Sequence, residues 1–221
     1  MPLHLTRALK LAAGVGVVAA IAVHFFARPL LLWTLAPLAT LLILAIAFAN
    51  WRARKDRYSR WITIGLLFSL AGDVLLLTPD HFFTLGLSAF LFTHIAYLVA
   101  FTRDTPFPAR LGLWIVFLLF AACCNFLLFS RLPARLLLPV AVYSVFLVSM
   151  AAQAMGRAFI LRTASARFAA IGASLFVLSD GLLAFDRFYQ PLPLAPLLIL
   201  VSYYAAQWLI ASSTDEPQLP L

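Results

Sequence analysis

Two aspartates stand inside long apolar stretches of the sequence. Asp73 lies in GLLFSLAGDVLLL, residues 65–77, and Asp180 lies in FAAIGASLFVLSDGLLAF, residues 168–185. Ionisable residues in such stretches usually serve a function, because burying a charge in hydrocarbon is expensive. Burial favours the neutral carboxyl group, and two neighbouring carboxyl groups can share one proton, which supplies both an acid and a base. We therefore predict acid–base chemistry by this pair; the alternative is that each aspartate only hydrogen-bonds a neighbouring helix.

Further polar residues lie in other apolar stretches. His94 and Tyr97 are three residues apart in LFTHIAYLVA and share one face of a helix, as do Tyr203 and Gln207 in SYYAAQWLI. His94 can hydrogen-bond a carboxylate or carry a proton. For Tyr97 and Tyr203, the alternative is an aromatic belt at the membrane surface. Tyr143 is a weaker candidate, since packing between helices also accounts for it.

The composition indicates that these residues lie in a membrane. Of 221 residues, 64% are hydrophobic and 11% are charged, against about 45–50% and about 25% in globular domains. Eight apolar runs are long enough to cross a hydrocarbon layer of roughly 30 Å as helices, and none alternates as a barrel strand does. We predict an all-α polytopic membrane protein with one domain, residues 1–211, and a short disordered cytoplasmic tail, residues 212–221. The runs are Leu9–Phe26, Leu30–Asn50, Trp61–Thr78, Phe82–Phe101, Leu111–Phe129, Leu136–Gly156, Phe168–Phe185 and Leu194–Ala211.

The runs that hold the two aspartates match in register. Each aspartate follows an arginine and a glycine at the same spacing and directly follows a small residue. Since these are the third and seventh runs, they cross the membrane in the same direction, which is typical of a parallel repeat of four plus four helices. Each aspartate is about a dozen residues into its helix, so both carboxyl groups lie roughly 18 Å from the cytoplasmic edge. The matching positions are Arg60, Gly65 and Gly72 in one run and Arg167, Gly172 and Ser179 in the other.

The basic residues orient the bundle. Twelve of the 16 lysines and arginines fall in segments that are cytoplasmic if the N-terminus is inside, so we expect both termini in the cytoplasm. The net charge of +8 is then mainly a topology signal, and we expect no nucleic-acid partner and no protein partner. The densest basic cluster, WRARKDRYSR at residues 51–60, could additionally hold anionic lipid headgroups. Short loops and this charge bias are typical of a bacterial inner membrane protein.

Several kinds of chemistry have no support in the sequence. It contains no Gly-x-Ser-x-Gly elbow, no His-Glu-x-x-His motif and no phosphate loop. The histidines have no ligand-like spacing, so we expect no metal and no cofactor. Cys123 and Cys124 are adjacent in a helical run and cannot bridge each other. Asn125, beside them, is accounted for by packing or a hydrogen bond between helices.

The motifs around the candidate residues resemble those of the YhhN family of membrane proteins, whose characterised members are lysoplasmalogenases. The resemblance covers roughly Leu30–Ala211, and its most specific motif is Ser-Asp-x-Leu-Leu-Ala around Asp180. One position departs from the family pattern, because Ala36 precedes Pro37 where the family has a lysine. If that lysine binds a phosphate or tunes an aspartate in the family, the substrate preference or the activity of this chain should differ. The other motifs are AGDVLLL around Asp73, FTHIAYLVAF around His94 and Tyr97, LPVAVYSVFLVSMAAQA around Pro139 and Tyr143, and YYAAQWLI around Gln207.

The resemblance implies hydrolysis of the vinyl-ether bond of a lysoplasmalogen, with lysoplasmenyl ethanolamine or choline as substrate and membrane lipids as surroundings. Such a bond is cleaved by protonation of its β carbon, which gives an oxocarbenium ion that water captures. As a hypothesis, one of Asp73 and Asp180 is the acid and the other stays ionised, with no ranking between them. Five further residues are expected to bind the substrate or to fix the protonation of the two aspartates. They are His94, Tyr97, Tyr143, Tyr203 and Gln207.

Transport is the alternative function. A parallel repeat with two acids at one depth and a nearby histidine also describes a proton-coupled transporter or a lipid flippase. The small size of the chain and the lack of a central Gly/Pro break in the aspartate helices argue against transport. A purely structural protein is a third possibility, for which two matched buried aspartates would be a needless cost.

Overall fold

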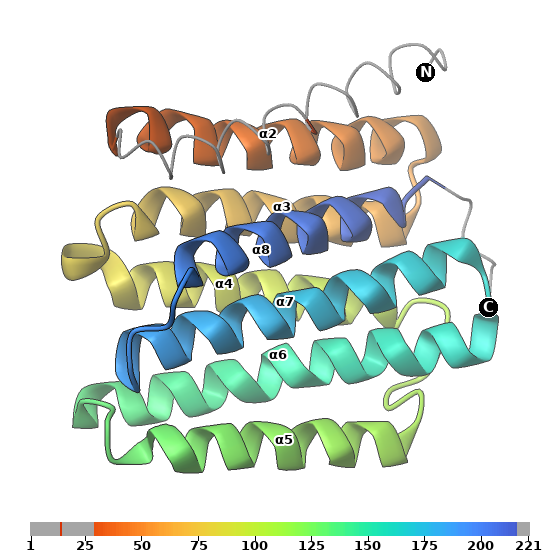
Figure 1. Cartoon of the computed structure of the whole chain (residues 1–221). Coiled ribbons are helices and arrows are strands. Elements are labelled where there is room, and N and C mark those ends of the chain that lie inside the picture. The colour runs from red at the N-terminus through yellow and green to blue at the C-terminus, as the bar shows by residue number, and fades with distance from the viewer. Residues whose placement is uncertain (1–13, 15–28, 216–221) are drawn as a thin grey trace.

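Seven helices form the part of the chain that the computed structural model describes, residue 14 and residues 29–215 (Figure 1). Every regular element within these residues is a helix, so the all-α prediction is confirmed. The expected first helix, Leu9–Phe26, lies outside the described residues, and the eight-span topology stays a prediction. The helices are α2 (Pro29–Arg54), α3 (Arg57–Leu76), α4 (Pro79–Phe101), α5 (Leu111–Phe129), α6 (Ala134–Leu161), α7 (Ala164–Phe188) and α8 (Ala195–Ser212).

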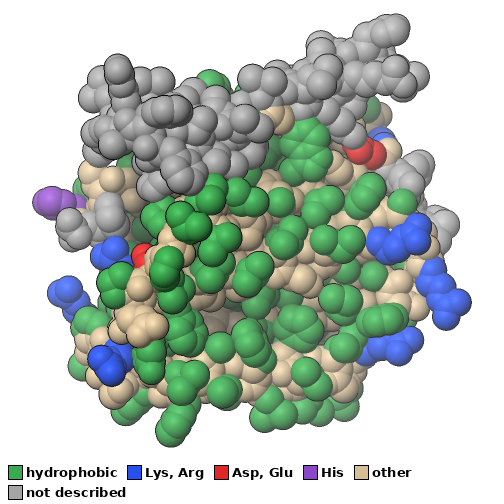
Figure 2. Space-filling model, in the orientation of Figure 1, with side chains coloured by type: hydrophobic (Ala, Val, Ile, Leu, Met, Phe, Trp, Pro, Cys, Tyr) green, Lys and Arg blue, Asp and Glu red, His purple; other side chains and the backbone are tan. Residues whose placement is uncertain are grey.

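Six of these helices, α3 to α8, are long and apolar enough to cross a membrane. They run side by side along one direction, and the connections alternate between the two ends of the bundle (Figure 1). Figure 2 shows hydrophobic side chains over most of one face, with lysine and arginine side chains gathered toward its two ends. This distribution fits a helical bundle whose middle lies in hydrocarbon and whose ends reach the headgroups.

The two ends of the bundle differ in charge. The basic end carries the connections α2–α3, α4–α5 and α6–α7, and the first of these holds the basic cluster at residues 51–60. The opposite end carries the connections α3–α4, α5–α6 and α7–α8. In the predicted orientation the basic end is cytoplasmic, because the positive-inside rule places such a cluster there.

The helices that carry the two aspartates begin in the same way. Asp56 caps α3 and Thr163 caps α7, each with its side chain accepting the backbone N–H three residues further on. The residue before each cap, Lys55 or Arg162, is left-handed, with φ of 57° and 56°. A side-chain cap satisfies one of the unpaired N–H groups at a helix start. The matched starts support the predicted parallel repeat, which stays a prediction.

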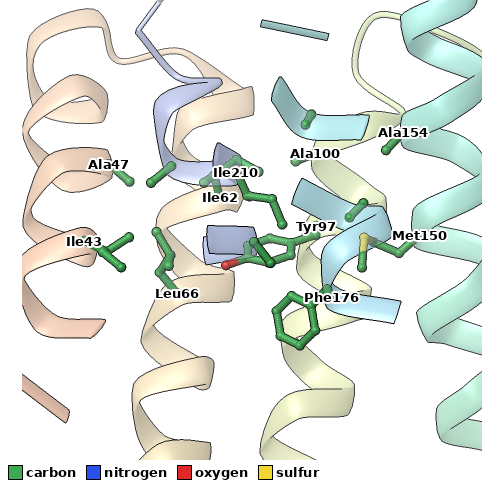
Figure 3. Close-up of a cluster of buried hydrophobic side chains, with 14 of the residues drawn as sticks. Ile43, Ala47, Ile62, Leu66, Tyr97, Ala100, Met150, Ala154, Phe176 and Ile210 are labelled. Carbon is green, nitrogen blue, oxygen red and sulfur yellow. The ribbon is translucent and has the colours of Figure 1, made fainter. Parts of the chain in front are cut away.

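The core lies where α2, α3, α4, α6, α7 and α8 meet, and small residues let these helices approach closely (Figure 3). Gly65 of α3 packs directly against the ring of Tyr97 on α4. Gly172 of α7 faces α8, where an added Cβ would lie 2.8 Å from the Ala206 carbonyl oxygen. Close packing through small residues is a common way to join helices in a membrane.

A buried ion pair joins α6 to the α4–α5 connection near the basic end. Arg157 is fully buried and donates from Nε to Asp104 Oδ1 at 2.8 Å and from Nη2 to Oδ2 at 2.6 Å. Its guanidinium carbon lies 4.7 Å from the centre of the Tyr58 ring. Arg157 lies toward the basic end of the bundle, and its side chain is buried among the helices. α6 continues past Gly156, so Arg157 is part of the packed bundle.

The C-terminal tail starts later than predicted. Ser212 is the last residue of α8, and both Ser213 and Thr214 are fully buried. The Tyr58 hydroxyl lies 2.7 Å from Ser213 Oγ, and Ser165 donates to the Ser213 carbonyl at 2.6 Å. The packed bundle therefore extends at least to these residues.

Replacing Asp104 should destabilise the bundle strongly. The Asp104→Asn variant keeps the shape of the side chain but leaves the buried guanidinium of Arg157 without a carboxylate, at a cost of about 3–5 kcal/mol. We expect a clear drop in the thermal unfolding temperature of the purified protein in detergent. Arg103→Gln is the control, because Arg103 is adjacent and exposed. Equal unfolding temperatures for the two variants would contradict a structural role for the ion pair.

Candidate active site

A cavity of about 320 Å³ lies among α3 to α8, in the half of the bundle away from the basic end. Its walls are mostly apolar, but both predicted acids, Asp73 from α3 and Asp180 from α7, line it. Tyr143 from α6 and Tyr203 from α8 line it as well. A concave apolar site with a few convergent polar groups is the usual form of a small-molecule site. The structure therefore brings the two aspartates to one cavity.

Asp73 accepts a hydrogen bond on each carboxyl oxygen. The Tyr203 hydroxyl donates to Oδ1 at 2.7 Å, and the Thr40 hydroxyl from α2 donates to Oδ2. Hydrogen bonds to both oxygens fix the orientation of the group and stabilise its charged form. The sequence analysis missed Thr40, because a single threonine in an apolar run has no pattern that marks it.

Tyr203 is itself held by a polar group of residues behind the cavity. Its hydroxyl lies 3.0 Å from Ser69 Oγ and receives the amide N–H of Gln207 at 3.2 Å. The Gln207 carbonyl oxygen accepts from the Tyr97 hydroxyl at 2.6 Å. Tyr97 and Gln207 are fully buried and do not line the cavity. The aromatic-belt interpretation of Tyr97 and Tyr203 is therefore wrong, since both lie inside the bundle.

Asp180 accepts a hydrogen bond on one carboxyl oxygen. The Tyr143 hydroxyl donates to Oδ2 at 2.5 Å, and within the described residues Oδ1 has no hydrogen-bond partner. His94 Nε2 lies 2.9 Å from the Tyr143 oxygen and 3.4 Å from Asp180 Oδ2. When Asp180 is ionised, the Tyr143 hydroxyl proton points to its carboxylate, and His94 Nε2 then carries the hydrogen of the other bond. His94 is fully buried and stands behind the cavity wall.

The two aspartates thus have related surroundings. Each accepts from a tyrosine hydroxyl, and each tyrosine oxygen is also hydrogen-bonded to a second buried side chain, Gln207 or His94. Phe176 lies between these two sets of residues. Its ring makes edge contacts with His94, at 4.8 Å between ring centres, and with Tyr203, at 5.5 Å. One aromatic ring therefore separates the hydrogen-bonded groups of the two carboxylates.

The cavity wall has a further polar contact on its α5 and α6 side. Asn125 donates to Ser144 Oγ at 2.7 Å, and both residues line the cavity. The predicted hydrogen bond between helices is confirmed for Asn125, although its place in the cavity wall was not expected. Cys123 and Cys124 are free thiols, and Cys124 also lines the cavity. Among the described side chains, no three His, Cys, Asp or Glu residues gather as a metal site would require.

Comparison with known proteins identifies the chain. A sequence model of the YhhN family matches residues 31–214, which include every residue of the site just described. The chain belongs to the YhhN family. Together with the six apolar helices, this membership identifies an integral membrane protein. The side chain of Ala36, the position that departs from the family pattern, lies outside the described part of the structure.

Several curated relatives have named activities. The chain is 34% identical to human lysoplasmalogenase TMEM86B over 189 residues, which is 85% of this chain and 78% of the relative. It is 35% identical to bovine lysoplasmalogenase TMEM86A over 164 residues, 72% of this chain and 67% of the relative. An uncharacterized membrane protein YhhN of Escherichia coli O157:H7 is 27% identical and covers 82% of this chain and 86% of its own. No solved structure gives a significant match.

Two glycines of α7 test the position of the cavity. Gly181 lines it, and an added Cβ there would meet no atom within 4 Å, whereas at Gly172 it would clash with α8. Alanine favours a helix by about 1 kcal/mol over glycine. We therefore expect Gly181→Ala to keep or raise the thermal unfolding temperature and Gly172→Ala to lower it. An equal loss in both variants would mean that Gly181 does not face open space.

Proposed function

We propose that this protein is a lysoplasmalogenase-like hydrolase. Its substrate would be a lysoplasmenyl ethanolamine or choline, cleaved at the vinyl-ether bond to a fatty aldehyde and a glycerophospho-alcohol. The proposal rests on one observation. Two hydrogen-bonded aspartates, Asp73 and Asp180, line one apolar cavity in the half of the bundle away from the basic end. The named activity of relatives at about 35% identity supports the same reaction. The predicted location is a bacterial inner membrane.

The cavity suits a lipid with a single chain. Its walls are mostly leucine, valine, phenylalanine and alanine, with polar groups around the two carboxyl groups and at Asn125 and Ser144. An alkenyl chain can lie against such walls without losing hydrogen bonds, while the ether bond meets the polar region. The cavity volume, about 320 Å³, is at the low end of ordinary ligand sites. A lysolipid therefore fits better than a phospholipid with two chains.

The reaction needs one protonated and one ionised carboxyl group. The acid transfers its proton to the β carbon of the vinyl ether, and the resulting oxocarbenium ion is stabilised by the other carboxylate. Water adds to the cationic carbon and gives its proton to the carboxylate that served as acid. The hemiacetal then loses its hydroxyl proton as the C–O bond to glycerol breaks and the glycerol oxygen is protonated, releasing the aldehyde. Water is the only reactant consumed besides the lipid.

Tyr143 and Tyr203 position the acids in this mechanism. Each hydroxyl donates to one carboxyl oxygen, so each side chain is oriented before substrate enters. His94, Gln207 and Tyr97 act through these tyrosines, because they do not line the cavity. Their role is to orient the hydroxyl groups of Tyr143 and Tyr203 toward the two carboxyl groups.

The first test is aldehyde release by the purified protein in detergent. Lysoplasmenyl ethanolamine is the substrate, and a saturated acyl lysophospholipid is the control. We expect aldehyde from the vinyl ether, and a loss of about a hundredfold or more in kcat for both Asp73→Asn and Asp180→Asn. Asp186→Asn is the matched control, since Asp186 is also on α7 but does not line the cavity.

The outcomes separate hydrolysis from transport. Full activity in both asparagine variants would exclude the mechanism. A well-folded protein that releases no aldehyde but moves protons or lipid in proteoliposomes would be a transporter. Transport is the alternative function that the sequence leaves open.

The tyrosines give a second, graded test. Tyr143→Phe and Tyr203→Phe each remove a hydroxyl that donates to a carboxyl oxygen, and we expect a fall in kcat of about tenfold, as for the loss of a hydrogen bond to a charged group. Within the described part of the chain, the Tyr97 hydroxyl bonds Gln207 and no carboxylate, so the effect of Tyr97→Phe on kcat should be smaller. The measurement is the rate of aldehyde release with unfolding temperatures determined in parallel. A Tyr97→Phe loss as large as the other two would contradict this order.

A further inference from the structure

Arg187 lies at the rim of the cavity, at the end of the bundle opposite the basic end. Arg187 is exposed in the last turn of α7, and its guanidinium carbon lies 4.4 Å from the centre of the Phe83 ring and 6.0 Å from that of Phe188. Both phenylalanines line the cavity. A guanidinium stacked on aromatic rings keeps its N–H groups available for a planar contact with an anion. Arg187 therefore presents hydrogen-bond donors at the edge of the apolar cavity.

Among the side chains that the structure describes, no carboxylate forms an ion pair with Arg187. Charged contacts elsewhere in the bundle include Arg157 with Asp104 and His94 with Asp180. Asp186, the neighbour of Arg187, accepts the backbone N–H of Leu192 at 2.9 Å. Arginine at this end also runs against the charge bias of the sequence, which concentrates basic residues at the other end.

Helix geometry sets Arg187 at a defined distance from Asp180. Residues seven apart share one face of a helix, and their α carbons are separated by about 10 Å along the axis. Helical side chains point toward the N-terminus, so the guanidinium leans back toward Asp180. Ala184, which lies between Asp180 and Arg187 on α7, lines the cavity, and so does Phe188, which follows Arg187.

The proposed substrate has the matching length. The β carbon of its vinyl ether and its phosphorus atom are joined by about seven bonds, which span roughly 8 Å when extended. One molecule can therefore place the β carbon at the carboxyl groups and the phosphate at Arg187. The sn-1 chain would then continue along the apolar wall.

We propose that Arg187 binds the phosphate of the lysophospholipid and thereby sets the position of the vinyl ether in the cavity. This inference rests on the proposed function for its substrate and deepens it by naming a headgroup site. In the predicted orientation, this site lies on the side away from the cytoplasm, so the substrate enters from the outer leaflet.

Binding of a lipid that cannot be hydrolysed tests the site directly. The probes are a 1-O-alkyl lysophosphoethanolamine and the 1-O-alkylglycerol that lacks its phosphate, each titrated into the detergent-purified protein. We expect Arg187→Gln to reduce the preference for the phosphate-bearing probe about tenfold, the size of a lost charged hydrogen bond. Arg187→Lys should keep part of the preference, because it keeps the charge but loses the planar fork.

Arg131→Gln is the matched control. Arg131 is also basic and lies near the same end, but it stacks at 5.3 Å on Tyr189, which does not line the cavity. Its replacement should leave the preference unchanged. In the aldehyde assay, Arg187→Gln should raise KM for lysoplasmenyl ethanolamine far more than it lowers kcat.

The outcomes keep the two proposals apart. An unchanged preference in Arg187→Gln, or an equal change in Arg131→Gln, would overturn the phosphate site even if the wild type releases aldehyde. A wild type that releases no aldehyde but shows the expected change in preference would overturn the proposed reaction and leave the phosphate site standing.

Discussion

A carboxyl group buried in an apolar bundle needs hydrogen-bond donors, and the arrangement of the site depends on this requirement. An unsatisfied polar group in an apolar bundle costs several kcal/mol, so each aspartate must be met by a neighbouring helix. Asp73 from α3 is met by Thr40 from α2 and Tyr203 from α8, and Asp180 from α7 is met by Tyr143 from α6. These contacts fix which helices face one another across the cavity. Packing through Gly65 and through Gly172 on the same two helices then sets their spacing.

Two buried acidic sites in the bundle have opposite properties. Asp104 is enclosed by its ion pair with Arg157, which donates to both of its carboxyl oxygens and stacks on Tyr58. Its charge is fully compensated, so it can only support the fold. Asp73 and Asp180 have hydroxyl partners in place of a guanidinium and border an open cavity. Their carboxyl groups are therefore open to a bound molecule, as the proposed acid–base chemistry requires.

Much of the fold could be predicted from the sequence, because charges and prolines bound the apolar runs. The run Leu111–Phe129 has the same bounds as α5, and the shared register of Asp73 and Asp180 pointed to a common site. The pairing of side chains could not be predicted. Helices that are apolar on all sides have no polar face to show which neighbours they contact. For this reason neither the contact of Thr40 with Asp73 nor the pairing of Arg157 with Asp104 was expected.

The aspartates match in sequence register, yet their surroundings are not equivalent. Asp73 uses both oxygens in hydrogen bonds, whereas among the described residues Asp180 has a partner for Oδ2 alone. The side chains that contact the two tyrosines also differ, since Gln207 is an amide and His94 is an imidazole. The ring of Phe176 lies between the two groups and keeps their hydrogen bonds apart. The proposed reaction needs two carboxyl groups in different roles, and these two groups differ in their hydrogen-bond partners.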